Sequence, residues 1–222
     1  MQSTSLLSAM PRLMVEVTVI VLGVLLALWA DAFWEEREDR QKEQAILTTV
    51  HQEFVENKRR FDLSIDHHKR MFDASVLVLE STPSDCNVDL LAAIDLASLN
   101  WHTFNAVSGA TQSLIASGEL DLIQDAELRV LLASWGGLNL DLAHDESRTV
   151  DLRDKIAEYM AREFPEYFSD SSDSTCPVLL GDGTFRGLIS LRAAEIYEVT
   201  TDNDEIPKSI EKILAATDPT KK

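Results

Sequence analysis

The side chains that could bind a metal ion or act in catalysis are the histidines and the acidic clusters, but their spacing does not fit a common site of either kind. His67 and His68 are adjacent, so on a helix they would point about 100° apart and could not share a metal ion as an i, i+4 pair can. Asp170, Asp173 and Asp182 lack the spacing of a calcium-binding loop. We therefore predict no metal site and no cofactor.

The motifs of common catalytic and nucleotide-binding sites do not occur in the sequence either. Ser108-Gly109 and Ser117-Gly118 lack the glycine frame of a nucleophile elbow. There is no Walker A motif, no dinucleotide-binding glycine motif and no zinc-protease H-E-x-x-H. The sequence therefore predicts no catalytic residue, and we expect a protein that is not an enzyme.

The charge balance argues against nucleic acid as a partner. Asp and Glu number 38 against 20 Lys and Arg, which gives a net charge of −18. Nucleic-acid binding needs a basic face that neutralises phosphates. The one basic cluster is Lys58-Arg59-Arg60, followed three turns later by residues 67–70. We expect it to pair with the acidic helices, and a docking site for an anionic partner is the alternative.

Two cysteines lie in Ser-, Asp- and Pro-rich stretches that read as loops. They are Cys86 in TPSDCN and Cys176 in SDSTCP. Cysteines in loops are suited to a disulfide, which would require an oxidising compartment. Two unrelated thiols are the alternative.

Residues 13–34 form an apolar stretch that predicts one transmembrane helix in a lipid bilayer. Its acidic residues, Glu16 and Asp31, lie near its two ends, where they can reach the headgroups. An aromatic cluster marks the expected second interface: Trp29, Phe33 and Trp34. An interfacial helix or a cleaved signal peptide is the alternative, because the uninterrupted apolar part is only 14 residues long.

One face of this helix is suited to packing against another helix. Its residues follow each other at helical steps: Glu16, Ile20, Gly23, Ala27 and Asp31. Gly23 and Ala27 form a small-x-x-x-small pair that lets a second backbone approach closely, and acids at membrane depth usually face protein. The alternative is that Gly and Ala are simply common in membrane spans.

The orientation of the span follows from competing arguments. Arg37, Arg40 and Lys42 directly after it favour a cytoplasmic soluble part by the positive-inside rule. Long domains, however, are translocated largely regardless of charge, and the cysteine pair suits an oxidising compartment. We expect the soluble part to lie in the periplasm rather than the cytoplasm.

Residues 35–80 predict a long helix that continues the span without a break. They contain no Gly and no Pro, and their inward stripe recurs every 3.6 residues rather than in a strict 3.5-residue repeat. The stripe comprises Val50, Phe54, Asn57, Phe61, Ile65, His68, Phe72, Val76 and Leu79.

The rest of the chain predicts an all-α domain. Helices are expected over 88–99, 101–117, 125–164, 188–199 and 206–216, with Asn87 capping the first and Asp125 the third. A kink or break is expected at Gly136-Gly137, and one short β-hairpin near 177–187. The organisation is therefore an N-terminal segment, a span, a membrane-proximal helix, a helical soluble domain and a tail. Their ranges are 1–12, 13–34, 35–80, 81–216 and 217–222.

Two stretches resemble a group of uncharacterised bacterial membrane proteins with a single N-terminal span and an all-helical soluble domain. They are EVTVIVLGVLLALWADAFWEEREDR and WHTFNAVSGATQSLIASGELDLIQDAELRVLLASW. The resemblance implies a bacterial inner membrane protein. The group has no assigned activity, so no functional residue can be carried over to this chain.

These observations favour a structural or accessory subunit that assembles with itself or with a larger inner-membrane complex. The alternative is a single-span helical bundle that binds a small ligand as a sensor.

Overall fold

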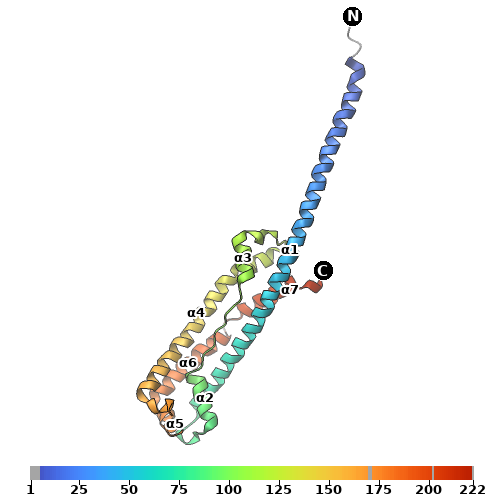
Figure 1. The fold of residues 1–222 in the computed structure, drawn as a ribbon. Coiled ribbons are helices and arrows are strands. Elements are labelled where there is room, and N and C mark those ends of the chain that lie inside the picture. Colours follow the sequence, from blue (N-terminus) through green and yellow to red (C-terminus); the bar gives the residue numbers. More distant parts are fainter. Residues whose placement is uncertain (1–5, 170–171, 202, 222) are drawn as a thin grey trace.

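The computed structural model describes residues 6–169, 172–201 and 203–221. Within those ranges it contains helices and no strand, which confirms the all-α fold (Figure 1). The α-helices are α1 Leu6–Glu80, α2 Val88–Ser98, α3 Gly109–Ser117, α4 Ala126–Glu163, α5 Ser172–Gly181, α6 Gly183–Thr201 and α7 Glu205–Thr217. Short 3-10 helices cover Pro83–Asp85, Glu119–Leu122, Pro165–Phe168 and Pro219–Lys221.

Helix α1 runs unbroken from the apolar N-terminal segment into the domain, as the sequence predicts. Ion pairs between residues four apart, Glu36–Arg40 and Glu38–Lys42, support the part that links the two. The N-terminal part of α1 projects away from the rest of the molecule, and its C-terminal part packs along the domain (Figure 1).

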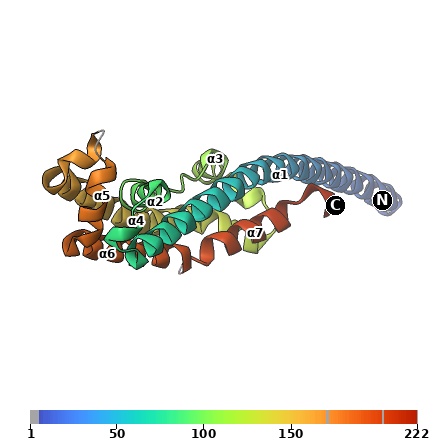
Figure 2. The same ribbon diagram turned by 90° about the horizontal axis from the view of Figure 1, so that it is seen from below.

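The domain is an antiparallel bundle of four columns. Helices α1 and α4 both lead away from the N-terminal end on opposite sides of the bundle, and α6 followed by α7 returns along both (Figures 1 and 2). The fourth column is α2, then an extended segment, then α3. We call this extended segment, residues 101–108, the strap.

The strap corrects the helix predicted over 101–117, since α3 begins only at Gly109. Gly118 ends it in the left-handed region at φ 76°, as a C-terminal glycine is expected to do. Helix α4 passes through Gly136-Gly137 without a break, and Asp125 caps it by accepting the Leu128 N–H at 3.0 Å.

The hairpin predicted near 177–187 is wrong. Helices α5 and α6 cover this region and only Asp182 separates them. The Asp182 carboxylate accepts the Phe185 N–H at 2.7 Å, so the Gly-Asp-Gly sequence caps a new helix instead of turning a hairpin.

The seam of α1 that faces the core is a strict heptad pattern, contrary to the 3.6-residue stripe read from the sequence. Ten buried positions alternate between steps of three and four: Leu47, Val50, Phe54, Asn57, Phe61, Ser64, His68, Met71, Ser75 and Val78. This is the a/d spacing of a helix packed as in a coiled coil. Four of the ten are polar. The stripe read from the sequence shares Asn57 and His68 with this seam, but its other positions after Phe61 are only half-buried: Ile65, Phe72, Val76 and Leu79.

Candidate functional site

Side chains of α1 hold the strap by hydrogen bonds to its backbone groups, as the backbone of a neighbouring strand would do in a sheet. The Asn57 amide donates to the Val107 carbonyl at 2.8 Å, and the Val107 N–H donates back to Asn57 Oδ1 at 2.7 Å. Arg60 donates to the Asn105 carbonyl at 3.1 Å. An Asn in the buried seam of α1 therefore satisfies backbone groups of the strap that no helix or sheet would satisfy.

A buried carboxylate from α4 holds the strap from the other side. The Phe104 N–H lies 2.9 Å from both carboxylate oxygens of Glu146, and the Ser64 hydroxyl donates at 3.3 Å. Glu146 is 2% exposed. Burial raises the pKa of Glu146 to about 7, and the hydrogen bonds from Phe104 and Ser64 oppose this rise. Glu146 has no local sequence signal for this role, because its partners lie 42 and 82 residues earlier in the chain.

The two ends of the strap are fixed by buried charged groups. At the α3 end, the Glu53 carboxylate accepts the Ala110 N–H at 2.6 Å and the Thr111 hydroxyl at 2.6 Å, at the positive end of the helix. At the α2 end, the fully buried Arg192 donates to the carbonyls of Ala97 and Asn100. Burial, followed by the charge of Arg153, lowers the pKa of Arg192 to about 10.

Aromatic packing anchors the middle of the strap. The Phe104 ring lies edge-on to the Phe61 ring, with 5.5 Å between the two centroids. The centroid of the Trp135 ring lies 6.5 Å from that of Phe104. Trp135 in turn packs on Phe54 at 4.8 Å. Phe104 therefore belongs to the core, even though the strap around it has no regular backbone structure.

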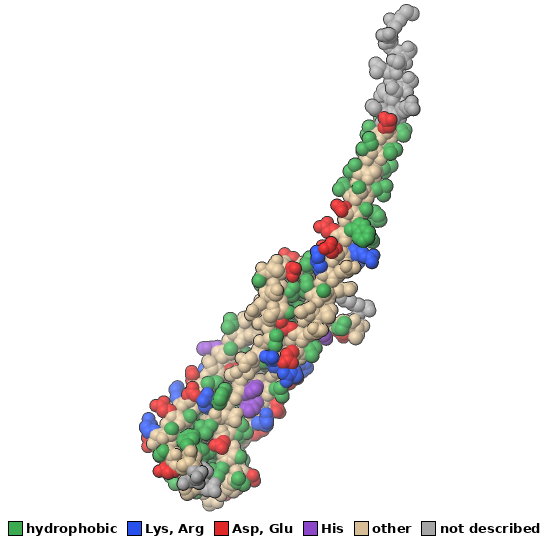
Figure 3. All heavy atoms as spheres, in the orientation of Figure 1, with side chains coloured by type: hydrophobic (Ala, Val, Ile, Leu, Met, Phe, Trp, Pro, Cys, Tyr) green, Lys and Arg blue, Asp and Glu red, His purple; other side chains and the backbone are tan. Residues whose placement is uncertain are grey.

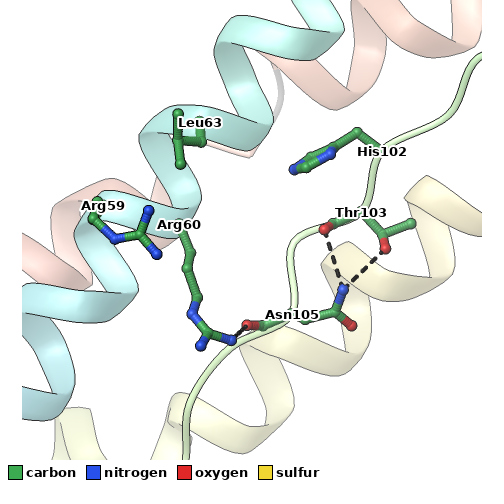
Figure 4. Close-up of a pocket in the computed structure, with 6 residues that line it drawn as sticks. All are labelled: Arg59, Arg60, Leu63, His102, Thr103 and Asn105. Carbon is green, nitrogen blue, oxygen red and sulfur yellow. Dashed lines mark hydrogen bonds between the residues drawn. The ribbon is translucent and has the colours of Figure 1, made fainter.

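A single extended chain is thinner than a helix, and a cavity lies on each side of the strap. The one beside α1 has about 280 Å³ and is lined by Arg59, Arg60, Leu63, His102, Thr103 and Asn105 (Figure 4). The other has about 440 Å³, lies between α3 and α4, and is mostly apolar; its lining includes Ile115, Ala133, Trp135, Gly136, Asn139 and Leu140.

The basic cluster borders the first cavity. Arg59 binds Glu56 at 2.7 Å and 2.8 Å, and Arg60 binds the same carboxylate at 2.7 Å. Hydrogen bonds from both arginines lower the pKa of Glu56 to about 2. Lys58 pairs with Asp62 at 2.8 Å. The cluster therefore pairs within α1, and the expected pairing with the acidic helices is wrong for these residues.

Two histidines lie close together here, and one of them, His102, lines this cavity. The ring of His102, on the strap, lies 5.0 Å from the ring of His67, whose Nε2 is 2.8 Å from the Asn100 side-chain oxygen. Partial burial lowers the pKa of His102, and the nearby His67 and Arg70 lower it further. Within the described ranges, no three His, Cys, Asp or Glu side chains are grouped so that they could hold a metal ion.

His68 faces away from this cavity into the core. It is fully buried, and its Nδ1 donates to the Ser64 carbonyl at 2.9 Å. Burial lowers the pKa of His68 to about 4, while the hydrogen bond to Ser64 opposes the change. The adjacent histidines thus point to different surroundings, as expected for neighbours on a helix.

The predicted membrane face lies on the projecting part of α1. All of its members are exposed: Glu16, Ile20, Gly23, Ala27 and Asp31. No atom lies within 4 Å of a Cβ built on Gly23, apart from those of its own helix backbone and chain neighbours. The predicted interfacial aromatics Trp29, Phe33 and Trp34 are also exposed, and the first two rings stack at 5.8 Å.

The structure joins Cys86 and Cys176 in a disulfide, with their Cα atoms 6.2 Å apart. It links the segment after α1 to α5, at the end of the domain far from the N-terminus (Figure 1). Cys176 was expected in a loop, but it lies within α5 and is fully buried. The Ser- and Asp-rich composition before it indicated a loop, although Ser172 already begins the helix.

In Figure 3 the projecting helix is mainly apolar apart from an acidic group next to its grey end, and most ionic groups lie on the domain and at its junction with that helix. One helix of the described residues, near the N-terminus, is long and apolar enough to cross a membrane. Comparison with models of protein families, with curated proteins and with solved structures finds no match for this chain.

Proposed function

We propose that this protein is a single-pass membrane subunit whose helical domain assembles with copies of itself or with a larger membrane protein complex. The observation that carries the proposal is the change of surroundings along α1. Its large apolar side chains are exposed on every side from Met14 to Trp34, whereas from Leu47 onward one seam of the helix is buried in the domain. On the sequence resemblance, the membrane is a bacterial inner membrane.

The exposed apolar part of α1 has the length of a membrane span. Residues 14–34 extend over about 31 Å at 1.5 Å per residue, which is close to the roughly 30 Å thickness of the hydrocarbon core. A helix that exposes this much apolar surface to water is unfavourable, and a lipid bilayer removes that cost. The stacked aromatics at its end are of the type that lies at the interface.

The assembly part of the proposal rests on the membrane face. Replacing Gly23 by Leu is expected to reduce the size of the complex on native gels in mild detergent, because the larger side chain prevents close approach of a second helix. Val24→Leu is the matched control, since it adds bulk on the neighbouring side of the same turn. An unchanged size for the Gly23 variant, in protein that still inserts in the membrane, would contradict the proposed face.

The soluble domain is proposed to lie on the periplasmic side, and the disulfide supports this. After cells are quenched with acid and the protein is unfolded in denaturant, we expect Cys86 and Cys176 to react with a maleimide only if a reductant is added. Cys86→Ser supplies the control, because it leaves Cys176 without a partner. Free thiols in the untreated wild type would instead place the domain in the cytoplasm, in agreement with Arg37, Arg40 and Lys42.

The decisive test of assembly is purification from native membranes in mild detergent. A homo-oligomer or a stoichiometric protein partner is expected. A solitary monomer would contradict the proposal.

A second function, ligand binding by the helical bundle, is favoured by one specific observation. The fourth column of the bundle is an extended strap instead of a helix along residues 101–108, and a cavity lies on each side of it. A monomer that retains a small molecule through purification would favour this function over assembly.

A further inference from the structure

We propose that the cavity between α1 and the strap binds a small oxyanion from the aqueous phase, through the guanidinium groups of Arg59 and Arg60 and the imidazole of His102. The proposal rests on the second function above and gives it a ligand class. It involves no residue of the membrane face, so assembly can be correct whether or not this site binds an anion.

The first support is the pair of guanidinium groups beside the cavity. Arg59 and Arg60 share a single carboxylate, that of Glu56, so one negative charge serves two guanidinium groups. His102 faces them from the strap across the cavity (Figure 4). Behind His102, the ring of His67 lies 5.0 Å away, and Arg70 pairs with Asp66 at 3.3 Å. Partial burial lowers the pKa of His102, so its imidazole contributes a hydrogen-bond donor rather than a charge.

The second support is the set of hydrogen-bond donors that remain. Arg59 uses Nε and Nη2 for Glu56, and Arg60 uses Nε for Glu56 and Nη1 for the Asn105 carbonyl. Among the described residues, Arg59 Nη1 and Arg60 Nη2 have no partner. Thr103 Oγ1 accepts from the Asn105 amide at 3.2 Å, so its own hydrogen is free to donate. Guanidinium nitrogens bind carboxylate and phosphate oxygens with directed, charge-assisted hydrogen bonds.

The third support concerns where the anion comes from. Trp34 and Arg59 are 25 residues apart on one continuous helix, which corresponds to about 37 Å. A lipid headgroup at the end of the proposed span cannot reach that far. The cavity, at about 280 Å³, is open to solvent and suits a small molecule that carries a phosphate or carboxylate group.

The test is a titration of the full-length protein in mild detergent with inorganic phosphate and, separately, with citrate. Binding is read as heat in calorimetry and as a rise in the thermal unfolding midpoint, with sodium chloride at equal ionic strength as the reference. We expect saturable binding of at least one of the two anions. A preference between phosphate and citrate identifies which oxyanion the cavity takes.

Three variants distinguish a specific anion-binding site from non-specific electrostatic attraction. Arg59→Gln removes a guanidinium whose hydrogen bonds are all to Glu56 on the same helix, and we expect it to weaken anion binding at least tenfold. Lys58→Gln removes the same charge one residue earlier, where Nζ pairs with Asp62, and should leave binding within about twofold. His102→Asn should weaken binding as Arg59→Gln does.

The proposal is overturned if neither anion binds beyond the sodium chloride reference, or if Lys58→Gln weakens binding as much as Arg59→Gln. In both cases the size of each variant on native gels reports separately on membrane assembly. Loss of anion binding with unchanged size would remove this site alone.

Discussion

Replacing Phe61 by Ala is expected to lower the free energy of unfolding of the full-length protein by about 3–5 kcal/mol. Phe61 lies on the buried seam of α1, and only 7% of its surface is exposed. Its ring meets Phe104 of the strap edge-on at 5.5 Å. The substitution therefore opens a cavity in the core and also removes the aromatic contact that holds the strap.

The measurement is chemical or thermal unfolding in mild detergent, followed by circular dichroism. Val55→Ala is the matched control, because Val55 is on the same helix but is half exposed, so its truncation should change stability by less than about 0.5 kcal/mol. Equal stability of the Phe61 variant and the wild type would show that this face of α1 does not pack against the domain.

The stability of the domain is expected to depend on pH through two buried groups that act in opposite directions. The pKa of Glu146 is raised to about 7, so the folded state binds its proton more tightly than the unfolded state does. Its stabilising contribution is complete below pH 4.5 and is lost as the pH rises to about 7. The pKa of His68 is lowered to about 4, so its contribution is complete above pH 6.5 and is lost as the pH falls to about 4.

Single variants should separate these two contributions. The unfolding free energy of Glu146→Gln minus that of the wild type is expected to increase by about 3 kcal/mol between pH 4.5 and 7, because Gln removes the cost of a buried charge. For His68→Gln the same difference should decrease by a similar amount between pH 4 and 6.5. The double variant should show a much flatter difference from pH 4.5 to 6.5. If the single-variant differences do not change with pH, the two side chains are not buried as the structure places them.

The long helix could be predicted because its signal is local. Residues 35–80 lack both helix-breaking residue types, and their charges pair along the helix surface, as Lys42 does with Glu38. The caps of α2 and α4 could be predicted for the same reason, since Asn87 and Asp125 accept N–H groups only three residues ahead, from Leu90 and Leu128.

The strap could not be predicted in this way. Its Val107 backbone is satisfied by Asn57, 50 residues earlier, and its Phe104 N–H by Glu146, 42 residues later. Each of these polar side chains reads locally as an ordinary helix position. The cavity beside α1 was equally hidden, because Arg59 and His102 become neighbours only when the strap lies across the helix.

The sequence by itself determined the elements whose causes lie within a few residues: the apolar length of residues 13–34, the unbroken α1, and the caps of the helices that follow. The tertiary structure decided which side chains of α1 are buried, because two polar members of its heptad seam, Ser64 and Ser75, lie where an apolar pattern gives no signal. It also decided that residues 101–108 are extended. Their backbone hydrogen bonds are made to helices distant in sequence, and a pattern read along the chain does not contain the position of those partners.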